Sequence, residues 1–221
     1  MVIVLLGAPG AGKGTQAPIL SEHLGIPILA SGDLLRAFAS DPASPLGREV
    51  DAIMKSGELV PDETIVRIFL ERLSAPDARD GAILDGFPRT AAQAGALDDA
   101  LVASGRRVDA AILIEVPEAE LIARMTDRWL CRAAGHIYNV RSHRPVQVGV
   151  CDIDGSELYK RADDALDTVR ARMAKQLAPL AEVVAHYQAA GVLHAVDGRQ
   201  GIDDVTGRVL AALGVEGATA S

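Results

Sequence analysis

The first fifteen residues constrain the fold most strongly, because an apolar run breaks directly into a glycine-rich turn that carries a lysine. The run is Val2-Ile3-Val4-Leu5-Leu6, and the turn is Gly7-Ala8-Pro9-Gly10-Ala11-Gly12-Lys13-Gly14-Thr15. This order predicts a buried strand, a loop whose backbone N–H groups surround an anion, and a helix that presents its positive N-terminal end to that anion. Lys13 can reach the outer phosphates of a nucleotide, so the leading ligand is a triphosphate such as ATP or GTP.

A magnesium ion and a carboxylate are expected beside that loop. Gly14 occupies the position at which Ser or Thr would ligate Mg²⁺, and Thr15 comes one residue later. We therefore expect Mg²⁺ to be held through phosphates, water molecules and distant carboxylates. Asp85 follows the apolar run 82–84, where nucleotide-binding enzymes with such a loop place a carboxylate near the metal. The alternative is that Asp85 caps a helix that begins near Thr90.

Composition narrows the class of protein. A chain of 221 residues with 49% hydrophobic content suits one α/β core with room for insertions. The net charge of −8 argues against nucleic acid as the main partner. No apolar run approaches the about 18 residues that a membrane span requires, and Met1 leads into a core strand without a basic leader. We therefore expect a cytoplasmic protein with no membrane partner.

Apolar runs alternate with helical patterns along the rest of the chain. Further strands are expected at 26–30, 82–84, 110–116 and 192–196, and helices at 14–24, 63–74, 90–104, 118–128, 162–190 and 202–213. This alternation predicts a parallel sheet wrapped by helices, with ligands bound at the carboxyl ends of the strands.

Two segments do not fit the alternation. The segment 31–60 is longer than a crossover helix requires and contains Asp41-Pro42-Ala43-Ser44-Pro45, so we expect a small helical insertion. The segment 129–160 lacks helical periodicity and holds several glycines, both cysteines and several aromatic residues. Irregular loops of this length are usually functional lids or disordered linkers, and the apolar and aromatic content favours a lid.

Two pairs of arginines flank the expected lid. Arg124 and Arg128 are four residues apart, and Arg161 and Arg172 are eleven apart, so each pair would share a face of a regular helix. Phosphoryl transfer gives a chemical reason for them, because charge on the transferred group must be neutralised in a dry site. The alternative is a solvated basic face. Nearer the first insertion, Ser31 and Asp33 could bind a ligand or cap a short helix.

Four motifs, taken in order, resemble those of bacterial adenylate kinases along essentially the whole chain. They lie at 6–16, 31–36, 84–90 with Gln93, and 161–164. Even Gly14 is what that family has. The resemblance implies a nucleotide-binding α/β core of the P-loop NTPase type with two mobile inserts, a nucleoside monophosphate-binding insert at 30–60 and a lid at 127–164. It also implies the reaction ATP + AMP ⇌ 2 ADP, with ATP, AMP and ADP as partners of a chain that we expect to be monomeric.

The resemblance also assigns roles to residues at matching positions. The phosphates would be neutralised by Lys13, Arg128, Arg161 and Arg172, and the ATP base would lie against Arg124. The AMP phosphate would be held by Arg36 and Arg89, and the AMP adenine would be recognised by Ser31 and Gln93. Water on Mg²⁺ would be oriented by Asp33 and Asp85. The catalytic set is Lys13, Arg89, Arg128, Arg161 and Arg172. The ATP side comprises Gly10, Ala11, Gly12, Lys13, Gly14, Thr15, Arg124, Arg128, Ile137, Tyr138 and Gln200, and the AMP side comprises Ser31, Arg36, Glu58, Leu59, Val60, Gly86, Phe87, Pro88, Arg89, Gln93, Arg161 and Arg172.

The lid departs from the family pattern for a zinc site. Such lids have Cys-x-x-Cys followed by Cys-x-x-Cys or Cys-x-x-Asp, whereas this chain has Ala134 three residues after Cys131, and Asp154 three residues after Cys151. Structural zinc prefers four protein ligands, so the three candidates would need His136 or water as a fourth. The sequence slightly favours a metal-free lid held by hydrogen bonds and packing over a zinc lid, and a Cys131–Cys151 disulfide is the third alternative.

Other functions stay open on the sequence. A kinase for UMP or CMP, or one that uses GTP as donor, is the nearest alternative. A P-loop ATPase would share Lys13 and Asp85 but would not need Arg36, Arg89 and Gln93. A nucleotide sensor without catalysis would have no use for the arginine set.

Overall fold

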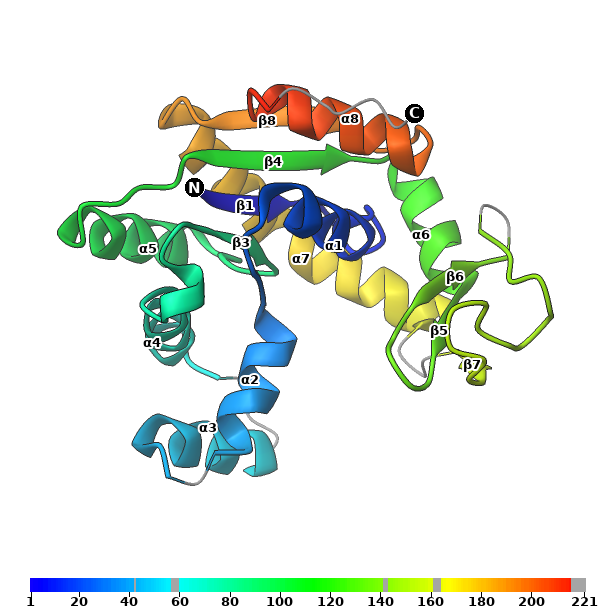
Figure 1. The fold of residues 1–221 in the computed structure, drawn as a ribbon, viewed down its shortest axis with the longest axis horizontal. Coiled ribbons are helices and arrows are strands. Elements are labelled where there is room, and N and C mark those ends of the chain that lie inside the picture. Colours follow the sequence, from blue (N-terminus) through cyan, green and yellow to red (C-terminus); the bar gives the residue numbers. More distant parts are fainter. Residues whose placement is uncertain (42, 57–59, 141–142, 161–163, 216–221) are drawn as a thin grey trace.

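Five apolar runs form one parallel sheet in the order β2-β3-β1-β4-β8. The strands are β1 (Val2–Leu6), β2 (Ile28–Ala30), β3 (Ala82–Asp85), β4 (Ala110–Glu115) and β8 (Leu193–Asp197). The computed structural model in Figure 1 describes residues 1–41, 43–56, 60–140, 143–160 and 164–215. The α/β class and the five expected strands are confirmed, with ends that differ by at most two residues.

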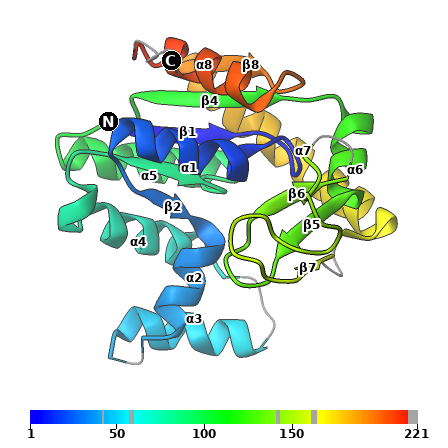
Figure 2. The same cartoon turned by 45° about the vertical axis from the view of Figure 1, so that its right-hand side comes forward.

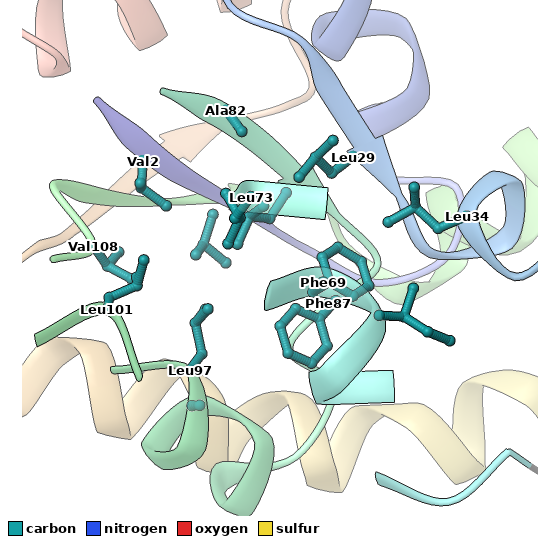
Figure 3. Close-up of a cluster of buried hydrophobic side chains, with 14 of the residues drawn as sticks. Val2, Leu29, Leu34, Phe69, Leu73, Ala82, Phe87, Leu97, Leu101 and Val108 are labelled. Atoms are coloured by element: carbon teal, nitrogen blue, oxygen red, sulfur yellow. The ribbon is translucent and has the colours of Figure 1, made fainter. Parts of the chain in front are cut away.

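Alternation along β1 builds two cores, one on each face of the sheet. Val2, Val4 and Leu6 enter one apolar cluster, and Ile3 and Leu5 enter the other. Successive side chains of a strand point to opposite faces, so a strand buried on both faces is a continuous apolar run. Figure 3 shows the first cluster around the side chains of Val2, Leu29 and Phe87.

Helices cover both faces of the sheet. The cluster of Ile3 includes side chains of α1 (Lys13–Leu24), α6 (Glu118–Thr126) and α8 (Ile202–Ala212), and the cluster of Val2 includes side chains of α4 (Asp62–Leu73) and α5 (Ala91–Ala103). The long helix α7 (Leu166–Ala189) contributes Val169 to the former cluster and Val183 to the latter. A short 3₁₀ turn, η1 (Pro76–Ala78), precedes β3.

Two expected helices are shorter than predicted, and this corrects both arguments from arginine spacing. α6 ends at Thr126, and Arg128 begins a strand in which it pairs with Asn139, so Arg124 and Arg128 do not share a helical face. α7 begins at Leu166, after Ala165 in an extended conformation, so the interval from 161 to 172 is not one regular helix. Strand pairing follows the end of α6, and an extended Ala165 precedes α7, and neither is visible in local periodicity.

The helical arm consists of α2 (Ser31–Ala39) and α3 (Pro45–Ser56), and it projects from the sheet in Figure 1. This part of the chain is helical, as expected. Leu34, Leu46 and Val50 of the arm belong to the same apolar cluster as Val2. The Thr64 hydroxyl of α4 donates a hydrogen bond of 2.7 Å to Glu49 of α3, which fastens the arm to the core.

The segment expected to form a lid, for which we keep the name lid, is not irregular throughout, contrary to the expectation for 129–160. It contains a three-stranded antiparallel sheet in the order β6-β5-β7, formed by β5 (Arg128–Cys131), β6 (Ile137–Asn139) and β7 (Leu158–Tyr159). Figure 2 shows this sheet apart from the parallel one. Its strands are too short for periodicity to reveal them. Among the described residues, no helix is both long and apolar enough to cross a membrane.

Candidate active site

The glycine loop between β1 and α1 has the backbone that an anion site requires. Gly7, Gly10 and Gly12 have φ angles of 145°, 84° and 109°, a region that favours glycine. A Cβ on Gly7 would lie 2.9 Å from the carbonyl oxygen of Ile114, whereas a Cβ on Gly12 would meet nothing within 4 Å. Gly12 therefore faces open space at the start of α1, where no side chain caps the helix.

Lys13 folds back across this loop. Its Nζ donates hydrogen bonds of 2.6 Å to the carbonyl of Gly7 and 3.3 Å to that of Ala8. Removal from water lowers the pKa of Lys13, the Asp85 carboxylate opposes this effect, and Arg89 adds to it. The amine thus stands beside the loop, in the field of a carboxylate and a second cation.

Asp85 lies at the carboxyl end of β3, between the ends of two neighbouring strands. Its register partners are Leu5 on β1 and Ala30 on β2. Burial raises the pKa of Asp85, Lys13 and Arg89 oppose this, and the Asp33 carboxylate raises it further. Thr90, not Asp85, caps α5, because the Thr90 hydroxyl accepts from the backbone N–H of Gln93. The capping alternative for Asp85 is therefore wrong.

Ser31, Gly86 and Arg89 form a cluster beside Asp85. The guanidinium of Arg89 donates 2.8 Å to the Ser31 hydroxyl and 2.7 Å to the Gly86 carbonyl. A Cβ on Gly86, which has a φ of 75°, would lie 2.7 Å from the Ser31 oxygen. Ser31 is the first residue of α2 and makes no cap, so its hydroxyl serves the cluster instead.

Gln93 is 3% exposed, and both ends of its amide have protein partners. Its Oε1 accepts 2.7 Å from the Arg89 backbone N–H, and its Nε2 donates 2.7 Å to Asp62. The Thr90 hydroxyl also donates to Asp62, over 3.2 Å. Sequence reasoning assigned no role to Asp62, whose place after Pro61 signals only the start of a helix.

Arg36 and Asp33 lie one turn apart on α2 and form an exposed ion pair. A Cβ on Gly32 would lie 3.4 Å from the Arg36 guanidinium, so this glycine leaves room for that side chain. Phe87 and Pro88 are buried, and the Phe87 ring stacks on Phe69 with centroids 4.1 Å apart (Figure 3). Their side chains hold the turn in the core.

The lid-side arginines have protein partners. Arg128 donates 3.0 Å and 2.6 Å to the two oxygens of Asp164, a residue that is 5% exposed. Arg124 donates 2.5 Å to Glu120 and 2.8 Å to the carbonyl of Gly198. Asp164 belongs to the motif at 161–164, but the sequence assigned it no role. Its partner Arg128 becomes apparent only when the strand β5 is placed.

The lid reaches the glycine loop through Ile137, because a Cβ on Gly14 would lie 3.6 Å from Cδ1 of Ile137. Tyr138 is buried inside the lid, and Gln200 is exposed after β8. Several expected positions cannot be placed in this geometry. Glu58, Leu59 and Arg161 lie outside the described residues, as does the side chain of Arg172.

The lid interior brings together four possible metal ligands. One ligand atom from each of Cys131, His136, Cys151 and Asp154 lies within 4.8 Å of the others. The Cys131 thiol donates 2.9 Å to Asp154, and His136 Nδ1 is 3.3 Å from both Cys151 Sγ and Asp154 Oδ2. Both cysteines are free, which does not support the disulfide alternative.

Two similar turns hold the thiols. In one, Gly135 N donates 2.9 Å to the Cys131 carbonyl, and in the other Gly155 N donates 2.9 Å to that of Cys151. The glycines have φ angles of 73° and 71°. Burial and Asp154 raise the pKa of Cys131, but hydrogen bonds from Ser156 and the backbone of 133–134 lower it, and the resulting pKa is about 7.

Comparison with known proteins gives one consistent result. The family model described as Adenylate kinase matches residues 5–192. The adenylate kinase of Caldicellulosiruptor bescii is 43% identical over 98% of this chain and 100% of its own length. That of Moorella thermoacetica is 46% identical over 97% of this chain and 98% of its own, and that of Streptomyces avermitilis is 42% identical over 99% and 100%.

Proposed function

This chain belongs to the adenylate kinase family, and from that premise we propose which of its residues carry the reaction. It is an enzyme that transfers a phosphoryl group reversibly between ATP and AMP to give two ADP, and the alternative functions are not favoured. The observation that supports the residue assignment is that two groups suited to phosphate, the glycine loop with Lys13 and the Arg89 cluster, lie at the carboxyl ends of adjacent strands.

The donor ATP is assigned to the glycine loop. The open backbone at Gly12 and the uncapped start of α1 suit the phosphates. Lys13 would exchange its bonds to the Gly7 and Ala8 carbonyls for phosphate oxygens. Arg128 would neutralise charge on the transferred group, held meanwhile in a fixed orientation by the two oxygens of Asp164. Arg161 and Arg172 keep the same role by resemblance.

The acceptor AMP is assigned to the side of Ser31, Arg36, Arg89 and Gln93. Arg89 and Arg36 would bind its phosphate, because a planar guanidinium matches phosphate oxygens with two parallel bonds. Gly86, Phe87 and Pro88 would contribute backbone, since the two latter side chains are buried. Ser31 and Gln93 would contact the base. No strong general base is required, because positioning and charge neutralisation dominate phosphoryl transfer.

Mg²⁺ fits the carboxylates beside Lys13. Asp85 is half-buried, and Asp33 is near enough to raise its pKa, so a divalent cation would offset their repulsion. When bound with ATP, the ion neutralises charge that develops on the phosphates. Asp33 and Asp85 would orient its water ligands, since Gly14 at the usual ligand position has no hydroxyl and Thr15 comes one residue later.

Two measurements test this assignment. A coupled assay that crosses ATP and GTP with AMP, CMP, UMP and GMP should give the highest kcat/KM for ATP with AMP. Lys13→Ala should lower kcat by at least about 100-fold, whereas Arg89→Ala should raise the KM for AMP far more than that for ATP. If Arg89→Ala weakened the binding of ATP alone, the assignment of the ATP and AMP sides would be wrong.

The inserts 30–60 and 127–164 are proposed to close over the two nucleotides, because transfer in open water would lose the phosphoryl group to hydrolysis. A mimic that joins two adenosines through five phosphates should protect both inserts from hydrogen exchange. ATP alone should protect the lid more than the arm. Equal protection of both by ATP alone would contradict separate closing elements.

Zinc is proposed for the lid, although the sequence slightly favoured a metal-free lid. His136 supplies the fourth donor that Ala134 cannot, and two thiols, an imidazole and a carboxylate are ligands that zinc accepts. Three of the donor–donor distances are 2.9–3.3 Å and all lie within 4.8 Å, a spread that brackets the about 3.3–3.8 Å expected between ligands in a tetrahedral zinc site. The metal would fasten together the two turns of the lid.

Metal analysis of the purified enzyme tests the zinc site directly. We expect about one zinc per chain, a melting temperature lowered by chelation, and loss of both properties in His136→Ala. His143→Ala is the matched control, because His143 stacks on Tyr138 in the same lid but lies outside the cluster. A melting temperature that chelation leaves unchanged would support the metal-free lid.

We also propose that the protein is a cytoplasmic monomer, and light scattering tests its mass.

A further inference from the structure

We propose that Asp62 fixes the orientation of the Gln93 amide and thereby sets the preference of the acceptor site for adenine over purines that carry a 6-oxo group. Asp62 is a positioning residue in this proposal, because it acts through Gln93. The proposal rests on the assignment of Gln93 to the acceptor base, which is part of the proposed function.

The hydrogen-bond partners of Gln93 permit one amide orientation. A carboxylate accepts and a backbone N–H donates, so Asp62 must face the Gln93 NH₂ group and the Arg89 N–H must face its oxygen. The two distances are both 2.7 Å. A flipped amide would set its oxygen against the Asp62 carboxylate and its NH₂ against the Arg89 N–H. Two hydrogen bonds would be replaced by two repulsive contacts.

Asp62 is itself held in place. It is the first residue of α4, and its second oxygen accepts 3.2 Å from the hydroxyl of Thr90, the residue that caps α5. The carboxylate therefore ties α4 to the start of α5. Gln93 is 3% exposed, so water offers little compensation for a flipped amide.

The remaining bonding capacity of the amide matches adenine. After bonding Asp62 and Arg89, Gln93 retains one N–H and one oxygen lone pair. Adenine offers a donor at its 6-amino group beside an acceptor at N1, which complements that pair. Guanine and hypoxanthine offer an acceptor at O6 beside a donor at N1, the opposite order. Asp62 thus makes reversal of the amide, which those bases would require, unfavourable.

The test compares AMP with IMP, because their bases differ only in the 6-substituent and the N1 proton. Asp62→Asn can donate as well as accept, so it tolerates both orientations of Gln93 better. We expect it to lower the ratio of kcat/KM for AMP to that for IMP by about tenfold, chiefly through KM for the monophosphates. The KM for ATP should not change.

Three further variants serve as controls for this interpretation. Glu63→Gln removes the same charge from the next residue of α4 and should leave the ratio unchanged, and Asp62→Glu keeps an acceptor-only group and should retain most of the preference. Asp62→Ala supplies the ratio if Asp62→Asn does not fold. If folded Asp62→Asn or Asp62→Ala keeps the wild-type ratio of kcat/KM for AMP to that for IMP, even with a lower melting temperature, the proposal is wrong. Asp62 would then serve only to hold α4 and α5 together.

The failure of the acceptor assignment would look different. Gln93→Ala should raise the KM for AMP and abolish the discrimination against IMP. If it leaves both unchanged, Gln93 does not contact the acceptor base, and the proposed function loses that residue. If Gln93→Ala behaves as expected while Asp62→Asn retains the wild-type ratio, the assignment of Gln93 stands and the role of Asp62 does not.

Discussion

The helical arm and the lid both lie outside the parallel sheet, but they are stabilised differently. The arm adds Leu34, Leu46 and Val50 to the main apolar cluster beneath the sheet. In the lid, a separate small cluster is formed by the buried residues Cys131, Tyr138, Cys151 and Leu158.

This difference predicts two kinds of motion. A segment that shares its core with the rest of the protein moves by repacking side chains of that core, whereas a segment with its own core can move as a unit. The cluster of Cys131, His136, Cys151 and Asp154 adds polar contacts to the small apolar interior of the lid. We therefore expect arm stability to be coupled to global stability and lid stability to be largely local.

The largest expected effect comes from truncating one leucine in each insert. Leu46 and Leu158 are equally buried, each 4% exposed. Leu46→Ala should lower the free energy of global unfolding by about 2–5 kcal/mol, because it leaves a cavity in the main core. Leu158→Ala should accelerate hydrogen exchange in the lid while global unfolding in urea changes far less. Equal losses of global stability would show that the lid shares the cooperative unit of the core.

A kinetic comparison sharpens the functional side of the contrast. Arg128→Lys keeps the charge but loses the fork that bonds Asp164, and we expect kcat to fall by about 100-fold. Arg36→Lys in the arm should raise the KM for AMP by about tenfold with a smaller change in kcat. Arg132→Lys serves as the lid control, since Arg132 pairs with Glu157 on the surface. If Arg128→Lys changed only KM, Arg128 would not stabilise the transition state.

The smallest expected effect concerns the fastening of the arm. Thr64→Val removes the hydrogen bond to Glu49 and should lower stability by about 1 kcal/mol. It should also raise the KM for AMP slightly, because a looser arm binds the acceptor less often in the closed state. Thr126→Val, which removes a hydroxyl bonded within α6, should leave the KM for AMP unchanged. A similar KM effect from both variants would contradict a specific fastening role.

Local sequence determined the sheet and the glycine loop. The strand of residues 2–6 is apolar on both faces, and the turn after it needs glycine at positive φ, so neighbouring residues alone specify that geometry. The helical arm was expected for a different reason, because the segment between the second and third strands is longer than one crossover helix requires. The family motifs then assigned roles to most of the charged residues of the site, including Asp85 and Arg89, which lie four residues apart at the end of β3.

Tertiary structure decided what depends on partners distant in the sequence. Arg128 leaves its expected helix because it pairs in a strand with Asn139 and bonds Asp164, 36 residues away. His136 joins the cysteines through strand pairing in the lid, not through the Cys-x-x-Cys spacing. Asp62 meets Gln93 because α4 packs against α5. Periodicity reports which face of an element is buried, but a hydrogen bond between elements depends on how those elements are placed, and that is set by packing of the whole core.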